Sequence, residues 1–558
     1  MTDIELNDEQ RAAVTTTAAN AVVIAGPGSG KTRVLAARVL ELIRRGAAPE
    51  SIVIITYTNA AADEIRARLN IEKPDMPLGY CGTLHGYALR LLERYGGQIR
   101  WFTTNIVVMD EERAEAAFEE YAKALGFKGT KAALETSRRS LMDRAGLPQF
   151  VGVKPQGADL VVASWFANML TTGAFDFDGI LYWGVGLLRS TRRIQNVPSH
   201  PVNLLVDEAQ DMANIDALFY AALPCISRFV VGDPDQAIFG FRGGNPSHVI
   251  GYANSPEWAT FKLEGNYRCG SDICEVANIL IRHSAKRVPK LSISRTGFYG
   301  SVETCYVPSA AHEQKVLAEN IRNQDPNQCA VLLRTNALVD DYAKALESYS
   351  IPIARRKERE RPKDWRLCKA ALTALANPEN DAVMLWLIGL AYDSDAAKRA
   401  RLAAAQARQG VNAVCVRLPA GVTPKTAPDH LAWLRVGPES IALAREALDR
   451  SATIADALLL LAQEERVSVT TGEGVTVCTM HSAKGREWET VYLPAFEQAI
   501  IPGRWKDVDI EEERRLVFVA VTRAKWRLIL SGANERKPNQ WATVAPAERS
   551  QFIGEMAS

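Results

Sequence analysis

The sequence predicts an α/β fold with parallel sheets, interrupted by mainly helical segments. Two stretches near the N-terminus, 21–43 and 51–69, have the same order: a short apolar run, a polar turn and an amphipathic helix. This order is typical of β-α-β units, whose buried strands run parallel. Two later apolar runs, beginning near 202 and 228, end in acidic turns. Because the chain has 558 residues, we expect several domains rather than one core.

The composition is that of an ordinary globular protein, with 47% hydrophobic and 23% charged residues. The net charge of +1 provides no global basic field, so a nucleic-acid site would have to be a local groove. Nine scattered cysteines without a C-x-x-C pair indicate a reducing, cytoplasmic setting. The longest apolar runs, such as 382–391, are too short to span a bilayer, and no membrane role is expected.

The first strand leads into a glycine-rich loop, AGPGSG at 25–30, which Lys31 and Thr32 follow. Glycines let the backbone curl so that its N–H groups point at a polyphosphate, and the next helix adds the positive end of its dipole. In such a loop the lysine reaches the β- and γ-phosphates and the threonine holds Mg²⁺. The string matches G-x-x-x-x-G-K-[ST] except that Ala25 stands first. The loop predicts a nucleotide site but does not indicate what the nucleotide is used for.

Two carboxylates, Asp207 and Glu208, follow the apolar run that begins near 202. A P-loop enzyme needs such a pair at a strand end, as a Mg²⁺ ligand and as a base that activates water. Strand ends are also commonly acidic and solvated. We favour the catalytic interpretation because the same predicted sheet carries Lys31.

The next strand ends in a turn that carries Gln236 and then Phe241 and Arg242. A glutamine at a strand end can sense a γ-phosphate or orient a water molecule. Phe241 follows neither strand nor helical periodicity. This favours a base-stacking surface with an adjacent phosphate contact over a core position.

Taken in order, these motifs resemble those of the UvrD/Rep/PcrA helicases of superfamily 1. The strings are LNDEQ, AGPGSGKT, TYTNAAADEIRARL, GTLHGYALRLL, VDEAQDM, VGDPDQAIFGFRGGNP and LEGNYRC, and then VLLRTNALVDDYAKALES, VTVCTMHSAKGREWETVYLP, EEERRLVFVAVTRAK and SQFIGE. The resemblance covers nearly the whole chain. It implies two RecA-like P-loop NTPase domains with parallel sheets, each carrying a mainly helical inserted subdomain, with ATP and Mg²⁺ between the two domains.

The resemblance also implies roles for single residues of the ATP site. Gln10 would read the adenine edge and Tyr267 would stack on its face, while Glu208 resembles the general base and Gln236 the residue that couples the γ-phosphate to DNA. Thr32 and Asp207 would hold the metal. The nucleotide-binding positions are Gln10, Ala25, Gly26, Pro27, Gly28, Ser29, Gly30, Lys31, Thr32, Arg33, Tyr267, Arg268, Gly485, Glu487 and Arg523.

Two of these positions, Arg268 and Arg523, resemble arginine fingers. Gly485 and Glu487 resemble the motif that contacts the γ-phosphate and the ribose. Two domains that close on ATP would bring both arginines to the transferring phosphoryl group. The alternative for Arg523 is an ion pair with the acidic run 511–513.

Six positions match residues that line the single-strand groove in this family: Tyr57, Thr83, His85, Phe241, Arg242 and His481. Aromatic faces stack on any base, which suits a motor that is indifferent to sequence. Leu84 stands where an aromatic is common, which would weaken one contact. Both histidines also fit ordinary capping or core positions.

The expected domains are 1–93 with 199–268 and 269–355 with 465–558 for the two motor domains, 94–198 for a helical insertion and 356–464 for a reduced helical accessory insertion. The accessory insertion contains most of a basic run, 354–366, and an alanine-rich helix, 394–410. Duplex contact and a solvated helix face are both open interpretations of the basic run.

The resemblance implies ATP-driven translocation along single-stranded DNA with 3′→5′ polarity, with duplex unwinding in replication, repair or recombination. The expected partners are single-stranded DNA and its junctions with duplex. Partner proteins from repair, replication or defence are not identifiable. One alternative is a translocase that strips proteins or drives a larger repair or antiviral complex. Another is a nucleotide-gated binding module or a kinase-like P-loop enzyme, in which the arginine fingers and the DNA motifs would be idle.

Overall fold

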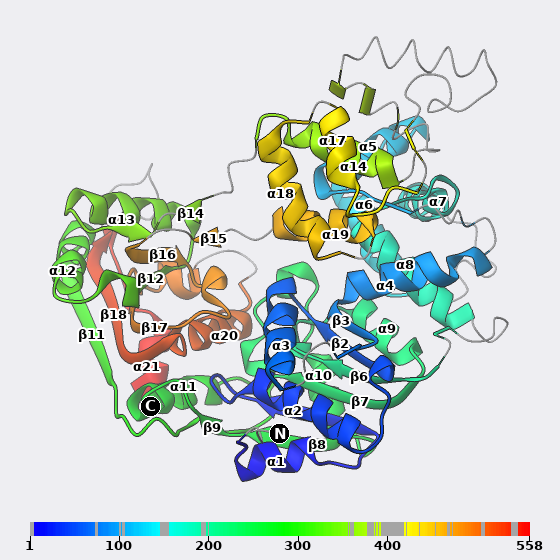
Figure 1. Ribbon diagram of the computed structural model, residues 1–558. Coiled ribbons are helices and arrows are strands. Elements are labelled where there is room, and N and C mark those ends of the chain that lie inside the picture. The colour runs from blue at the N-terminus through cyan, green and yellow to red at the C-terminus, as the bar shows by residue number, and fades with distance from the viewer. Residues whose placement is uncertain are drawn as a thin grey trace.

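Two sheets of parallel strands form the lower part of the computed structural model, and helical segments lie above them (Figure 1). The structure describes residues 5–557 except 73–75, 100, 101, 103–105, 146–155, 191–196, 199, 355, 358–361, 420, 435, 452, 466–468, 471, 472, 504–507 and 537–544, and within 377–417 it describes only 384, 387, 388, 390 and 391. The alanine-rich stretch 394–410 therefore lies outside the described residues, as does part of the basic run. The predicted α/β class with parallel sheets is confirmed.

The first sheet has six parallel strands, and its strand order is β3-β2-β6-β7-β1-β8. The strands are β1 (Asn20–Ala25), β2 (Ile52–Thr56), β3 (Tyr80–Thr83), β6 (Val202–Val206), β7 (Cys225–Gly232) and β8 (Ala259–Leu263). Parallel neighbours require a crossover between them, and here helices supply it. The helices are α1 (Asp8–Val14), α2 (Lys31–Arg44), α3 (Asn59–Glu72), α4 (Leu84–Tyr95), α9 (Asn214–Ala222) and α10 (Ser247–Asn254).

Alternate residues of the central strands face two different cores. In β1, Val22 and Ile24 pack with helices α4 and α9, whereas Val23 packs with helices α1, α2 and α3. In β2, Ile55 packs in the core with α4 and α9, and Ile54 packs in the core with α1, α2 and α3. A strand that is covered on both faces needs apolar residues throughout, which is why these strands read as continuous apolar runs.

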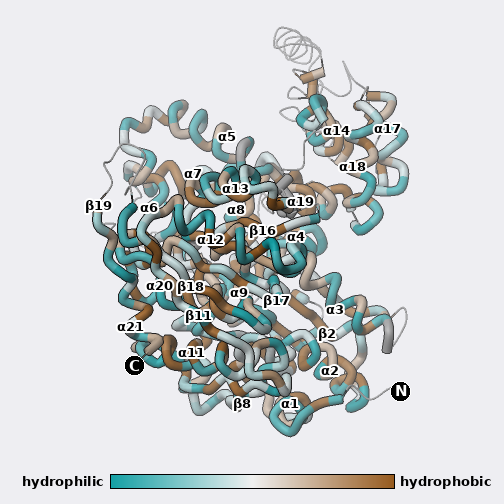
Figure 2. Tube along the Cα trace, turned by 90° about the vertical axis from the view of Figure 1, so that its left-hand side faces the viewer, coloured by the Kyte–Doolittle hydropathy of each residue, from teal (hydrophilic) through white to brown (hydrophobic). Residues whose placement is uncertain are grey.

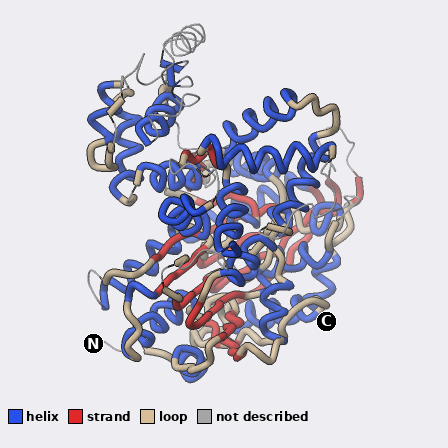
Figure 3. Tube along the Cα trace, turned by 90° about the vertical axis from the view of Figure 1, so that its right-hand side faces the viewer, coloured by secondary structure: helices blue, strands red, loops and turns tan. Residues whose placement is uncertain are grey.

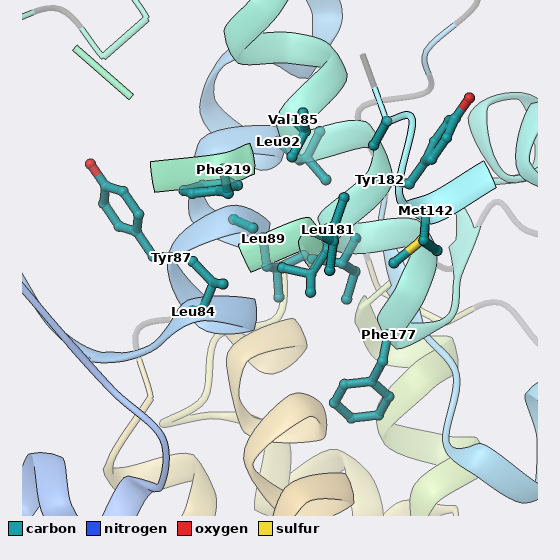
Figure 4. Packing of buried hydrophobic residues seen from close by; sticks show 14 of the residues in the cluster. Leu84, Tyr87, Leu89, Leu92, Met142, Phe177, Leu181, Tyr182, Val185 and Phe219 are labelled. Atoms are coloured by element: carbon teal, nitrogen blue, oxygen red, sulfur yellow. The ribbon is translucent and has the colours of Figure 1, made fainter. Parts of the chain in front are cut away.

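A helical body between β3 and β6 packs on helices α4 and α9, which cover one face of the first sheet. It consists of α5 (Glu111–Ala124), α6 (Lys131–Met142), α7 (Gly157–Thr172) and α8 (Phe177–Ser190), with a short parallel pair, β4 (Val107–Val108) and β5 (Ala174–Phe175). Figure 4 shows Leu89 and Leu92 of α4 beside Leu181 and Val185 of α8. This contact joins the helical body to the first sheet through one continuous core.

The second sheet has six parallel strands in the order β11-β18-β17-β12-β16-β13, and β19 pairs antiparallel with β18. The strands are β11 (Ser301–Ser309), β12 (Cys329–Leu333), β13 (Ile353–Ala354), β16 (Val475–Thr479), β17 (Trp488–Leu493), β18 (Ala524–Arg536) and β19 (Ala545–Pro546). The surrounding helices are α11 (Ser271–Arg282), α12 (Ala310–Arg322), α13 (Asn336–Ser348), α20 (Ile510–Val521) and α21 (Gln551–Ala557). Helices α11, α20 and α21 share one core with the sheet, and α12 and α13 share the other.

Two small sheets lie where the chain passes between larger bodies. Strand β9 (Gly265–Asn266) pairs with β10 (Ile293–Ser294), and β14 (Arg356–Lys357) pairs with β15 (Val469–Thr470). Beyond β14 lie the accessory helices, which have a core of their own. They are α14 (Trp365–Ala376), α17 (Ala427–Trp433), α18 (Pro438–Asp449) and α19 (Ile454–Glu465).

The hydrophobic residues concentrate in the strands, while the outer helices carry long hydrophilic stretches (Figure 2). Figure 3 shows that the long strands gather in one half of the molecule and that the bodies beyond them are almost wholly helical. Among the described helices, none is long and apolar enough to cross a membrane.

Candidate functional site

The glycine-rich loop between β1 and α2 has the backbone that only glycine adopts easily. Gly28 and Gly30 have φ values of 66° and 82°. A Cβ on Gly28 would lie 2.7 Å from the Oδ1 atom of Asn266 and from the Cβ of Arg268, so the loop closely approaches the start of the second half. The Ser29 hydroxyl donates to the Gly26 carbonyl at 2.8 Å, which fixes the curl of the loop. Ala25, Gly26 and Pro27 are buried beneath it.

Lys31 and the two predicted carboxylates meet at the ends of β1 and β6. The Nζ atom of Lys31 lies 3.9 Å from the Oε2 atom of Glu208. Glu208 itself has a φ of 48°, an unusual conformation for a non-glycine residue that turns the chain directly after Asp207. The Asp207 carboxylate accepts from the Glu208 N–H at 2.9 Å, and the Gln210 amide donates to the Glu208 carboxylate. The two acids are therefore held in fixed and different environments.

Electrostatics separate the two acids further. Burial is the main cause that raises the pKa of Asp207, to about 7, and the charge of Glu208 acts in the same direction. Burial would also raise the pKa of Glu208, but the charges of Lys31 and Lys484 outweigh burial and lower it. Glu208 is the carboxylate that these two lysines keep ionised.

Arg523 is a fully buried guanidinium, 2% exposed. It donates to the carbonyls of Val519 and Arg486, at 2.8 and 3.3 Å, and to the Thr522 hydroxyl at 3.2 Å. Within the described residues no carboxylate forms an ion pair with it. Burial, and then the nearby charge of Arg268, lower its pKa to about 9, although Glu208 and Glu487 act in the opposite direction. A buried cation without a direct ion pair among the described residues is costly, so this position favours an anion beside it.

The alternative partner of Arg523, the acidic run 511–513, is engaged elsewhere. Glu511 pairs with Arg514, the Glu512 carboxylate accepts from the Gly240 N–H, and Glu513 pairs with Arg334. The ion pair considered from the sequence is not formed.

The other arginine, Arg268, is paired. Its Nε atom lies 2.5 Å from the Oε2 atom of Glu487, whose other oxygen lies 2.8 Å from the Nζ atom of Lys525. Two positive side chains therefore share one acid. Gly485, two residues before this acid, has a φ of 81° and open space around its Cα.

The residues predicted for adenine lie at the start of α1 and after β9. Asn7 caps α1 in a capping box with Gln10, whose Oε1 accepts from the Asn7 N–H. The Gln10 Nε2 donates to the Ser29 carbonyl at 2.9 Å, which ties the cap to the glycine loop. The half-exposed Tyr267 ring is oriented by a 2.8 Å hydrogen bond from the Asn7 amide to its hydroxyl. Arg33, on the exposed side of α2, donates to the Glu5 carbonyl.

The turn after β7 joins this site to a row of aromatic rings. Gln236 is 4% exposed and its Nε2 donates to the Oδ2 atom of Asp233 at 2.5 Å. The carbonyl of Gln236 accepts from Lys484 at 3.1 Å, and Lys484 also pairs with Asp211. Lys484 comes from the second sheet and the other three residues from the first, so this turn lies at the contact of the two bodies.

Aromatic rings form a row from the first body to the second. Tyr57 stacks on Phe239 with ring centroids 6.0 Å apart and planes at 7°. Phe239 meets Phe241 edge to face at 6.0 Å, and Phe241 meets His481 at 5.8 Å. Phe241 is 62% exposed although it lies in a structured turn. Exposed aromatic rings in a row are the surface on which unpaired bases stack.

Of the other three predicted groove residues, Thr83 and His85 do not belong to this row. Thr83 is buried, and its hydroxyl accepts from the Gly86 N–H as the N-cap of α4. The His85 ring packs against Phe177 at 5.2 Å. Arg242 lies in the turn after Phe241, and its side chain lies outside the described part of the structure.

Two residues that take part in this site, Phe239 and Lys484, were not identified from the sequence. Lys484 lies 4.8 Å above the Phe239 ring and so links the aromatic row to the Gln236 turn. The FGF spacing was a usable signal for Phe239, because residues two apart in an extended loop can face the same side.

Comparison with known families agrees with this geometry. A model described as the UvrD/REP helicase N-terminal domain matches residues 6–255, and the UvrD-like helicase C-terminal domain matches 442–535. The two matches together cover well over half of the chain. The chain belongs to the UvrD/Rep helicase family.

Curated relatives match this UvrD/Rep family member over almost its full length. DNA helicase II of Salmonella typhimurium is 27% identical, over 99% of this chain and 87% of its own. The ATP-dependent DNA helicase PcrA of Leuconostoc citreum is 26% identical, over 99% and 85%. The ATP-dependent DNA helicase UvrD1 of Mycobacterium tuberculosis is 27% identical, over 99% and 85%.

Proposed function

We propose that this UvrD/Rep helicase hydrolyses ATP with Mg²⁺ to move along single-stranded DNA in the 3′→5′ direction and to separate duplex ahead of it. The observation that carries the proposal is that the turn 233–242 has Gln236 at the nucleotide site and Phe239 and Phe241 in the aromatic row. A shift of this turn on ATP binding would therefore move the groove surface directly.

The ATP site fits a nucleotide and a divalent ion. The positive φ of Gly28 and Gly30 and the unpaired charge of Arg523 support a bound polyphosphate. The Thr32 hydroxyl and the Asp207 carboxylate are hard oxygen donors suited to Mg²⁺, which would neutralise phosphate charge when bound. Lys31 would contact the same phosphates.

The remaining residues act on the attacking water and on the developing charge. Glu208, kept ionised by its lysine neighbours, would accept the proton of that water. Arg523 and Arg268 would stabilise the phosphoryl oxygens. Arg268 must first leave the Glu487 carboxylate, so hydrolysis would depend on how the two bodies close.

Both sheets contribute to this cleft, which supports the two motor domains expected at 1–93 with 199–268 and at 269–355 with 465–558. The insertions at 94–198 and 356–464 would then guide the duplex. The proposed setting is cytoplasmic, with single-stranded DNA and its duplex junctions as partners.

The test measures ATP hydrolysis with and without single-stranded DNA, and then displacement of a labelled strand from duplexes with a 3′ or a 5′ tail. Stimulation with displacement only from the 3′-tailed duplex supports the proposal. Stimulation without displacement would contradict the unwinding part and favour a protein-stripping translocase or a partner-dependent motor. Hydrolysis that is indifferent to DNA would overturn the proposal.

A further inference from the structure

A buried lysine from the connection between the two bodies lies beneath the Gln236 turn. The segment 283–292 follows α11 and leads into β10, and it carries Arg287 and Lys290. Lys290 is only 8% exposed. Its alkyl chain passes close to the glycine loop, since a Cβ on Gly26 would lie 3.8 Å from its Cε atom.

Lys290 bridges two acids of the turn. Its Nζ atom lies 2.6 Å from the Oδ1 atom of Asp233 and 2.5 Å from the Oδ2 atom of Asp235. Burial alone would lower the pKa of Lys290, but the two carboxylates outweigh burial and raise it. Of the two acids Arg287 binds Asp235, at 2.9 Å, and it also donates to the Lys290 carbonyl at 3.2 Å. Lys290 is therefore the cation that holds Asp233 within the described residues of this cluster.

Asp233 links Lys290 to Gln236. One of its oxygens binds Lys290, while the other accepts from the Gln236 Nε2 at 2.5 Å. Its N–H donates to the Gln210 Oε1 at 2.8 Å, and Gln210 in turn donates to Glu208. Without the lysine, Asp235 would keep its ion pair with Arg287, but Asp233 would lose its ion-pair partner and, as a buried carboxylate, would have to protonate or move.

The segment that carries Lys290 is bonded to both bodies. On the side of the first body, the Leu291 N–H donates to the Glu264 carboxylate at 2.8 Å and the Asn266 amide donates to the Ser292 hydroxyl at 2.9 Å. Asn278 of α11 exchanges two hydrogen bonds with Ser292, at 2.8 and 2.9 Å, two residues beyond Lys290. Helix α11 is part of the core of the second sheet, whereas Asp233 ends a strand of the first. A rotation between the bodies would therefore pull on the Lys290–Asp233 contact.

We propose that Lys290 is a positioning residue for ATP hydrolysis: it holds Asp233, and through it Gln236, in register with the second body. This inference rests on the function proposed above. The proposed role belongs to Lys290 and not to Arg287, because Arg287 anchors the same segment through Asp235 without contacting Asp233.

The experiment measures kcat and KM for ATP at saturating single-stranded DNA in Lys290→Met. We expect kcat to fall about 10- to 100-fold, as for other residues that orient a reacting group, with KM changed less than about threefold. Lys286→Met removes an exposed charge from the same segment and should leave kcat unchanged. An unchanged kcat in Lys290→Met would overturn the inference.

A mutant cycle separates positioning from general damage. Combined with Gln236→Ala, Lys290→Met should cost little more than the worse single variant, because both act through one contact. Losses that multiply would contradict the inference. If wild-type protein does not hydrolyse ATP, the proposed function fails instead.

A second pair of variants guards against misfolding of Lys290→Met. Asp235→Asn keeps the Lys290–Asp233 contact and should retain kcat. Lys290→Met/Asp235→Asn removes one charge of each sign and leaves a single buried acid, yet should lose kcat as Lys290→Met does. Equal kcat in these two folded variants, judged by thermal unfolding, would refute the role of Lys290.

Discussion

The first body contacts its two neighbours in different ways. Its contact with the second motor body carries many charges, with Arg268 paired to Glu487 and Lys484 paired to Asp211. Its contact with the accessory helices has an apolar centre, where Leu459 of α19 shares a core with α4 while the opposite side of α19 packs on α14. Two ion pairs, Arg450–Asp63 and Lys369–Asp110, lie beside this centre.

This difference indicates which of the two contacts of the first body a bound nucleotide can alter. An anion between Arg268 and Arg523 competes directly with Glu487, so ion pairs in the cleft can exchange on binding and release. An apolar contact offers nothing for phosphate to compete with. Each fully buried leucine contributes about 1.5–3 kcal/mol whether or not nucleotide is present. The ion pairs between the two motor bodies can therefore change when nucleotide binds. The apolar contact keeps the accessory helices attached whether or not nucleotide is bound.

The largest effect is expected in the cleft, from Arg523→Ala. Removing an arginine finger should lower DNA-stimulated kcat by about 10³-fold or more. Thermal stability should stay the same or rise, because an unpaired buried charge is lost. Arg527→Ala, which removes a partly exposed pair between β18 and Glu303 of β11 a few residues beyond Arg523, is the control and should change kcat by less than about twofold. A kcat above about one tenth of wild type in Arg523→Ala would refute the finger assignment.

The second effect is expected at the accessory contact, from Leu459→Ala. Truncation of this buried side chain should weaken the contact by about 2–5 kcal/mol, which limited proteolysis between the accessory helices and the first body would detect. Hydrolysis in the absence of DNA should not change. Leu458→Ala is the matched control, because Leu458 faces the accessory core itself. Loss of hydrolysis in Leu459→Ala would show that the two contacts are not independent.

The third effect concerns the aromatic row, where Phe241→Ala should weaken single-strand binding by about 1–3 kcal/mol. Fluorescence anisotropy with a labelled oligonucleotide measures it. Phe298→Ala removes an equally exposed ring that lies outside the row and should bind as wild type does. Equal losses in both variants would argue against stacking in the row.

The smallest effect is expected for Arg450→Met, which removes an ion pair with Asp63 at the rim of the accessory contact. Both side chains are about one third exposed or more, so the loss should be at most about 1 kcal/mol. Raising the salt concentration should therefore leave the accessory contact nearly intact while it depresses DNA binding steeply. Proteolysis and anisotropy over one salt series would compare the two. Parallel losses would mean that charge, not apolar burial, holds the accessory helices.

Local sequence predicted the parts of the fold and the site that local chemistry determines. The parallel strands follow from apolar runs such as Ile52–Thr56, and the glycine loop from the residues before Lys31. The interpretation of Thr83 as a groove residue did not foresee its capping role, because a cap and a groove position have the same residue type.

Contacts between distant segments could not be predicted from the sequence. That none of the described carboxylates forms an ion pair with Arg523 depends in part on how residues 511–513 find other partners. The sharing of Leu459 between two bodies requires knowing where α19 docks. Hydrophobic periodicity predicts that a helix has a buried face but not which neighbour covers it.

The order of strands in the two sheets determines how early in synthesis each body can fold. The first sheet is complete once residue 263 has been made, so its core can assemble while the ribosome is still translating the rest. In the second sheet β18 lies between β11 and β17, and β11 waits more than two hundred residues for this neighbour. A chain truncated before residue 524 would contain the nucleotide loop on a body that can fold. It would lack Lys525, and the strand edges that β18 normally covers would be open.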